Sequence, residues 1–136
     1  MTLQPLIDAP WAIKAHVATL LPALVLGAWL LAFSHKGSKA HRWVGALFFA
    51  LMVTTALITL FIHRRSAYGP FGFGLQHLFI PFTLFSTWRA LDGALKGNIK
   101  QHRAWVFGLY FGSLIINGAM NIFLFPGAAH DVFFSR

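Results

Sequence analysis

The sequence predicts an all-α membrane protein whose four transmembrane helices form two repeated hairpins in one bundle. Three observations support this prediction: four long apolar runs, a scarcity of charge, and matching motifs in the two halves of the chain. Of the 136 residues, 57% are hydrophobic and only 10% are charged, whereas about a quarter of a soluble domain is charged. The connections between the apolar runs are too short for a further domain, so we expect residues 1–136 to form a single transmembrane domain.

The four apolar runs define the expected spans. A helix needs roughly 20 apolar residues to cross the hydrocarbon of a bilayer. Four segments meet this requirement, at about 11–33, 43–62, 71–88 and 104–125. Tryptophans fall at the ends of these segments, where aromatic side chains gather at membrane surfaces: Trp11, Trp43, Trp88 and Trp105. Pro22 and Pro81 occupy corresponding places inside the first and third spans, and each should loosen its helix locally.

The basic residues predict an orientation. Lys and Arg are enriched on the cytoplasmic side of membrane helices. Seven of them flank the connections within the two hairpins, and four lie on the opposite side of the bilayer. We therefore expect a bacterial cytoplasmic membrane protein with both hairpin connections in the cytoplasm and both termini on the periplasmic side. The net charge of +8 does not indicate a nucleic-acid partner, because the basic residues flank apolar segments instead of forming a basic face.

Four histidines occur at duplicated positions. The interval between His16 and His41 equals that between His77 and His102. Because successive helices run in opposite directions, His16 and His77 begin spans on the outer side, and His41 and His102 begin spans on the inner side. Ionisable side chains are rare at membrane depth and usually mark function. The flanking motifs are also repeated, with Lys36-Gly37 and Lys96-Gly97 before the inner histidines and Arg42 and Arg103 directly after them.

Two histidine pairs, one in each leaflet, form the pattern that a transmembrane b-type cytochrome requires. Haem iron takes two axial imidazoles, and the core of a helical bundle is a natural place for such a site. We expect His16 and His77 to bind the iron of an outer haem b, and His41 and His102 to be the less certain ligands of an inner one. Glycines that would let the macrocycle lie against the backbone are Gly45, Gly108 and Gly112 inside and Gly72 and Gly74 outside. Basic residues that would contact haem propionates or anionic lipid are Lys36, Lys39, Arg42, Arg64, Arg65 and Arg103.

Each of these sites has an alternative interpretation. Anchoring at the lipid headgroups is favoured over ligation for His41 and His102. For His16 and His77 we give equal weight to two roles, which are binding to haem iron and a satisfied polar contact, in which the ring forms a hydrogen bond within the protein. Asn117 and Asn121 lie one turn apart on the fourth span. Polar residues of this kind usually form hydrogen bonds between helices, and we favour that role over a quinone site. The three acidic residues are scattered along the chain, which excludes chemistry that needs paired carboxylates, and we assign no catalytic residue.

Several short motifs resemble those of a known family. They are Gly97-Asn98-Ile99-Lys100-Gln101-His102-Arg103-Ala104-Trp105, Gly108-Leu109-Tyr110, Phe125-Pro126-Gly127, His41-Arg42-Trp43-Val44-Gly45 and Gln76-His77-Leu78. Together they resemble an uncharacterised family of predicted four-helix bacterial inner-membrane proteins, a domain of unknown function with repeated His-Arg motifs. The resemblance implies four membrane helices with histidines at these positions, and it implies no established activity. The layout is also similar to that of small transmembrane b-type cytochromes, which pass electrons between quinone, superoxide or ascorbate and a partner.

Two functional expectations follow. The first is an electron-transfer protein that binds haem b through two histidines, as part of a membrane oxidoreductase of quinone or superoxide type. The alternative is a non-enzymatic accessory subunit that packs against a larger membrane complex and binds anionic lipid through its basic loops. The cytochrome would be a monomer or a homodimer, whereas the subunit would be held in the complex.

Overall fold

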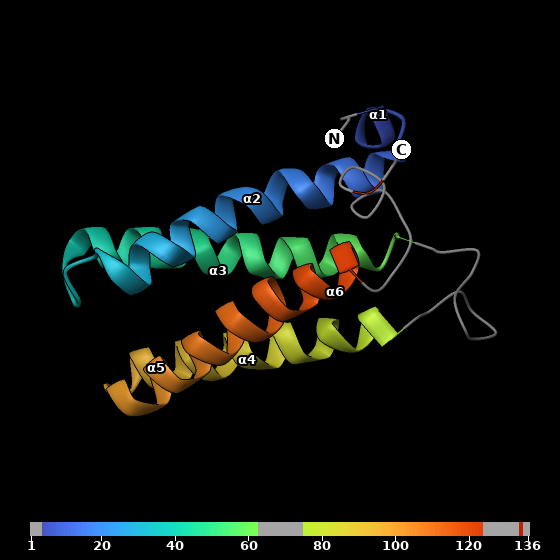
Figure 1. Cartoon of the computed structure of the whole chain (residues 1–136). Coiled ribbons are helices and arrows are strands. Elements are labelled where there is room, and N and C mark those ends of the chain that lie inside the picture. Colours follow the sequence, from blue (N-terminus) through green and yellow to red (C-terminus); the bar gives the residue numbers. More distant parts are fainter. Residues whose placement is uncertain (1–3, 63–74, 124–133, 135–136) are drawn as a thin grey trace.

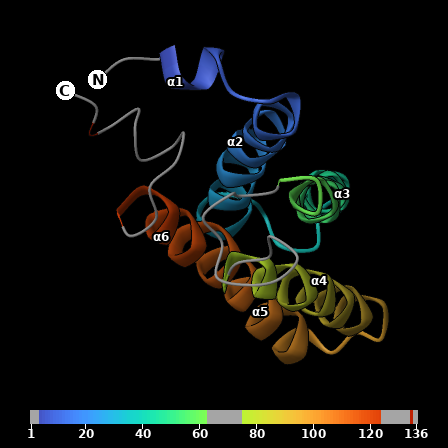
Figure 2. The ribbon, with the colours of Figure 1, turned by 90° about the vertical axis from the view of Figure 1, so that its right-hand side faces the viewer.

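The computed structural model describes residues 4–62, 75–123 and 134, and within these ranges every regular element is helical. The elements are α1 (Gln4–Ile7), α2 (Trp11–Ala32), α3 (Lys39–Thr59), η1 (Leu75–Leu78), α4 (Phe79–Leu95), α5 (Ile99–Phe107), η2 (Gly108–Ile116) and α6 (Asn117–Phe123). The last three follow one another without a break and form one long helix. Figure 1 shows two antiparallel hairpins, one of α2 and α3 and the other of α4 with α5, η2 and α6. We call the long helical segments rods: α2, α3, α4 and the continuous helix of α5, η2 and α6. Viewed from the end, these rods pack into one bundle (Figure 2).

Three of the four rods are long and apolar enough to cross a membrane: Trp11–Ala32, Lys39–Thr59 and Ile99–Phe123. The remaining helix, α4, has 17 residues, which is fewer than the roughly 20 that a span usually needs. The sequence predicts the third span over 71–88, but the helix continues past Trp88 to Leu95, because the first helix-ending signal is the Lys96-Gly97 turn. Residues 71–74 lie outside the described part of the chain. The all-helical fold with three candidate spans is therefore confirmed, and a fourth span stays a prediction.

Both hairpin turns contain a glycine in the left-handed conformation. Gly37 and Gly97 adopt positive φ angles of 82° and 70°. This conformation is strained for other residues but accessible to glycine. The two connections differ in length, because α2 ends at Ala32, several residues before Gly37, whereas α4 ends at Leu95 and only Lys96 precedes Gly97. The duplicated Lys-Gly motif therefore supplies the same glycine conformation to two turns of different length.

The residue that follows each turn glycine caps the next helix. The Ser38 hydroxyl accepts a hydrogen bond from the His41 backbone N–H at 3.1 Å, and the Asn98 amide oxygen accepts one from the Gln101 N–H at 3.1 Å. Such caps satisfy backbone donors that have no partner within the helix. Because the caps set where α3 and α5 begin, they place His41 and His102 near the start of these helices. Helix α3, which corresponds to the second predicted span, therefore begins at Lys39, before the predicted start of that span at residue 43.

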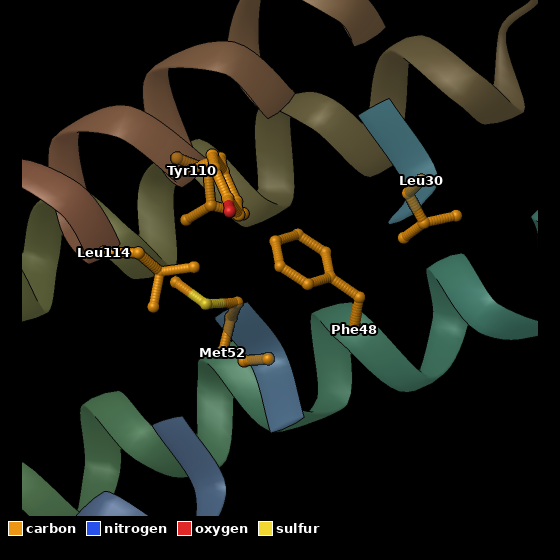
Figure 3. Close-up of a cluster of buried hydrophobic side chains, with 7 residues drawn as sticks. Leu30, Phe48, Met52, Tyr110 and Leu114 are labelled. Carbon is orange, nitrogen blue, oxygen red and sulfur yellow. The ribbon is translucent and has the colours of Figure 1, made fainter. Parts of the chain in front are cut away.

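A single hydrophobic core joins the first hairpin to the last rod (Figure 3). Gly27 on α2 makes this approach close, because a Cβ atom at that position would lie 2.5 Å from the Tyr110 ring and 2.9 Å from the Phe48 ring. The buried core residues are Ala23 and Leu30 of α2, Phe48 and Met52 of α3, and Leu109, Tyr110 and Leu114 of η2.

The middle of the last rod, η2, is a π-helix. Segments of this type are rare and often occur at functional sites. The Tyr110 hydroxyl of η2 donates a hydrogen bond to the Leu24 carbonyl of α2 at 3.2 Å. On the other side, Ser113 Oγ lies 2.7 Å from Thr83 Oγ1 of α4. Polar side chains of η2 therefore contact α2 of the first hairpin and α4 of the second hairpin, to which η2 itself belongs. The apolar pattern of the sequence does not indicate these contacts.

Replacing Gly27 with alanine should destabilise the bundle. The added methyl group would overlap two aromatic rings of the core, and overpacking of this kind typically costs about 1–3 kcal/mol. Thermal unfolding of the purified protein in mild detergent measures the effect. Gly118→Ala is the matched control, because a Cβ there would meet nothing within 4 Å. Equal melting temperatures for the two variants would contradict the packing of α2 against Tyr110 and Phe48.

Candidate functional site

The imidazole rings of His41 and His102 lie close together at the end of the bundle where both hairpins turn. Their centroids are 6.4 Å apart, and their planes are inclined at 78°. The two side chains are half-buried and come from different hairpins, one from α3 and the other from α5. Both helices begin at this end (Figure 1). The structure thus brings together the pair that the sequence assigns to the inner side.

Hydrogen bonds at Nδ1 hold both rings and define their tautomers. His41 Nδ1 lies 2.8 Å from Ser34 Oγ, whose own proton is donated to the Leu30 carbonyl at 2.8 Å. His102 Nδ1 lies 2.8 Å from the Ala90 carbonyl, which can only accept. In the neutral state each ring therefore carries its proton on Nδ1 and a lone pair on Nε2. A backbone or side-chain partner at one ring nitrogen is typical of histidines that bind a metal through the other.

A close approach of two backbones positions His102. At Gly93 of α4, an added Cβ would lie 2.7 Å from the backbone nitrogen of His102 and 3.1 Å from the Asn98 carbonyl oxygen. Backbone atoms cannot rotate aside as a side chain can, so this position requires glycine. Sequence reasoning missed Gly93 and Ser34 as positioning residues; the signal for the first is a glycine inside a helical pattern, which often has a packing reason.

An aromatic ring contacts one member of the pair, and the glycines that the sequence assigns to the haem differ in what surrounds them. The Phe49 ring packs edge-on against His102, with centroids 6.4 Å apart and planes at 89°. A Cβ added to Gly45 or Gly108 would meet nothing within 4 Å. Gly112 differs, because a Cβ there would lie 2.8 Å from the Phe82 ring. Gly112 therefore allows close packing of η2 against Phe82 of α4. Gly72 and Gly74 lie outside the described residues.

The outer histidine of the first hairpin is bound to its neighbouring helix. His16 Nδ1 on α2 lies 3.3 Å from the Thr55 carbonyl and 3.1 Å from Thr59 Oγ1, both on α3. The Thr55 hydroxyl in turn donates to Thr19 Oγ1 at 2.7 Å. This is the satisfied polar contact that the sequence left open as an alternative to ligation. His77 lies half-buried in the short 3₁₀ helix η1, directly before α4, so both outer histidines lie at the end away from the hairpin turns.

The basic residues near the inner pair are largely exposed at the hairpin end. Lys36 donates hydrogen bonds to the carbonyls of Leu30 and, at 3.1 Å, Leu31. It thereby satisfies carbonyls at the end of α2, as cations at helix C-termini commonly do. The exposed basic residues nearby are Lys39, Arg42 and Arg103. The other two basic residues of the predicted set, Arg64 and Arg65, lie outside the described part of the chain.

A polar network fastens α5 to the end of α4. Asp92 forms ion pairs with Lys96 at 2.7 Å and with Arg89 at 3.9 Å. The Gln101 amide donates to the Asp92 carboxylate at 3.1 Å and to the Arg89 carbonyl at 2.9 Å. Hydrogen bonds from Lys96 and Gln101 lower the pKa of Asp92. The carboxylate therefore stays charged and supports the turn that precedes His102.

Among the described residues, no group of three or more His, Cys, Asp or Glu side chains is placed to hold a metal ion. The site at the hairpin end thus offers two imidazole donors and no third protein ligand of these types from the described ranges.

The Nδ1–H tautomer of His41 and His102 is directly testable. Histidine 15N chemical shifts of the protein in lipid bilayers, at a pH where both rings are neutral, should report a protonated Nδ1 and an unprotonated Nε2 at both positions. The cause is that Ser34 Oγ and the Ala90 carbonyl both act as acceptors at Nδ1. The exposed His35 of the hairpin loop serves as the reference. An Nε2–H tautomer at His102 would contradict the hydrogen bond to Ala90.

Comparison with known proteins identifies one family. The model of a family described as "Predicted membrane protein (DUF2306)" matches residues 13–134 and so extends over nearly the whole chain. No curated protein and no solved structure shows a significant match.

Proposed function

The chain belongs to the DUF2306 family of predicted membrane proteins. From the arrangement of two histidines at the hairpin end, we propose that it binds haem b between His41 and His102 and transfers electrons in the membrane. The observation that carries the proposal is the pair of imidazoles from two hairpins, with centroids 6.4 Å apart. Both rings have their proton on Nδ1, so both offer the lone pair of Nε2 to an iron.

The spacing of the rings suits two axial ligands. Rings that share one metal have centres roughly 6 Å apart, because each metal–nitrogen bond is about 2 Å long. The angle of 78° between the ring planes is compatible, since each ring can rotate about its own bond to the iron. Two imidazoles alone make an incomplete site for a bare ion, but a porphyrin brings four nitrogens of its own. The donor set therefore suits haem better than a free metal ion.

Other residues of the hairpin end would hold the macrocycle. The open positions beside Gly45 and Gly108 supply backbone surface without a side chain in the way. The exposed Lys39, Arg42 and Arg103 supply cations for the propionates. Their number at this end also supports the proposed orientation, with the hairpin turns facing the cytoplasm of a bacterial cell and the termini in the periplasm.

Haem supplies reversible one-electron chemistry when it is bound. The chain's own contribution is to orient the two rings. The Ser34 hydroxyl and the Ala90 carbonyl accept the Nδ1 protons, which fixes the ring planes and increases the basicity of Nε2. His16, whose Nδ1 also faces a carbonyl, remains the proposed ligand of an outer haem together with His77. A quinone is the proposed electron partner.

An absorption spectrum, oxidised and reduced, tests the proposal. The protein is produced with a haem precursor in the medium and purified in mild detergent. We expect a Soret band and the sharp visible bands of low-spin haem. His41→Ala and His102→Ala should each remove one axial ligand and abolish the low-spin spectrum of the inner haem. His35→Ala is the matched control, because that histidine lies exposed in the adjacent loop.

Two outcomes would contradict the proposal. Absence of a Soret band under every growth condition would favour the accessory subunit, which should then co-purify with a larger membrane complex. Loss of all haem in His16→Ala, with full retention in His41→Ala and His102→Ala, would exclude the inner site and assign the cofactor to the outer histidines.

A further inference from the structure

A patch of buried hydroxyl groups lies between α4 and η2. Three of its members, Thr83, Ser86 and Thr87, occupy one face of α4, because residues three and four positions apart share a helix face. The fourth, Ser113, belongs to the π-helical segment. All four side chains are buried, and Ser86 is 0% exposed. Together they place several hydroxyl groups in the buried part of the second hairpin.

Two of these hydroxyls form a pair, and two do not. Thr83 Oγ1 and Ser113 Oγ are 2.7 Å apart. The oxygens of Ser86 and Thr87 are buried and have no hydrogen-bond partner among the described residues. A hydroxyl left in this state inside an apolar medium is unfavourable, which is why buried polar atoms are nearly always satisfied.

Ser86 and Thr87 differ from the other hydroxyls of the described helices in lacking a partner. A serine or threonine inside a helix commonly donates its hydroxyl proton to the carbonyl one turn earlier. Thr19, Thr54 and Thr59 do so, and Thr55 and Thr83 bond to hydroxyls of neighbouring helices. Ser86 and Thr87 make neither kind of bond within the described part of the chain, although their oxygens are buried.

We propose that Ser86 and Thr87 bind water, and that this water forms a proton path from the hairpin end of the bundle to the Thr83–Ser113 pair. Water is the ligand of choice because it is small enough for a packed interface and can both donate to and accept from each hydroxyl. The path begins beside His102, since Ala90, whose carbonyl binds His102 Nδ1, follows Ser86 and Thr87 by one helical turn.

Proton transfer along this path leaves every group unchanged. Each hydroxyl and each water accepts a proton on one side and releases one on the other, so no oxidant or further reactant is needed. The path ends at Ser113, near the middle of the last rod, and therefore brings protons into the membrane without opening a route across it. It depends only on the hydroxyl patch and does not rest on the haem proposal.

Water-edited solid-state NMR of the protein in lipid bilayers tests the proposal. The experiment measures how fast magnetisation passes from mobile water to individual side chains. Ser86 and Thr87 should receive it as fast as His102 at the hairpin end. Met52 is the matched control, because it is 2% exposed, as deeply buried as the hydroxyls, and lies in the apolar core. Transfer to Ser86 and Thr87 as slow as transfer to Met52 would overturn the proposal.

A double variant, Ser86→Ala with Thr87→Val, tests the continuity of the path. Without the two hydroxyls, transfer from water to Thr83 and Ser113 should fall to the rate of Met52. Unchanged signals of Met52 and Tyr110 would establish that the variant keeps its core. Fast transfer of magnetisation from water to Thr83 in a folded double variant would overturn the role of Ser86 and Thr87. The haem spectrum of the same sample reports separately on the inner histidines.

Discussion

The hydrogen bond from His102 to the Ala90 carbonyl is the interaction on which the candidate site depends. It joins the two helices of the second hairpin at the place where Gly93 lets their backbones touch. The half-buried His102 ring finds an acceptor within the protein, in the backbone of the neighbouring helix. Binding through Nδ1 leaves Nε2 as the nitrogen that can serve another group. His41 binds Ser34 in the same way, so the repeated hairpins produce two rings in equivalent states.

The packing of one hairpin against the other determines what those two rings can do together. Gly27 allows α2 to approach Tyr110, and the π-helical segment directs Tyr110 toward α2 and Ser113 toward α4. Both α3 and α5 pack against α4, and the side chains of His41 and His102, near the starts of α3 and α5, reach each other from these positions. The proposed haem site would use the two imidazoles that this arrangement brings together from different hairpins, whereas the proposed hydrated path would lie within the second hairpin.

The sequence predicts well what is determined locally. His41 and His102 lie near helix starts as expected, because the turns and caps before them depend on a few neighbouring residues. The helices themselves begin at Lys39 and Ile99, before the predicted starts at 43 and 104, since their first turns are polar and do not belong to the apolar runs. Contacts between helices are harder to foresee, because they depend on helix rotation and on how closely two backbones approach. His16 lies deeper within its predicted span than His41, which favours His16 as a haem ligand. In the structure His16 forms hydrogen bonds with Thr55 and Thr59. The rings that lie together are those of His41 and His102. The π-helix and the role of Gly93 depend on the same long-range contacts.

Cross-linking measures the juxtaposition of His41 and His102 most directly. The chain contains no cysteine, so a His41→Cys and His102→Cys double variant carries only the two thiols of interest. A short bifunctional thiol reagent should join them within one chain, and mass spectrometry of the digested protein should detect the linked peptides. Ser34→Cys with His41→Cys is the positive control, and His16→Cys with His102→Cys, from opposite ends of the bundle, is the negative control. A link in the positive control without one between positions 41 and 102 would contradict the arrangement of the two hairpins.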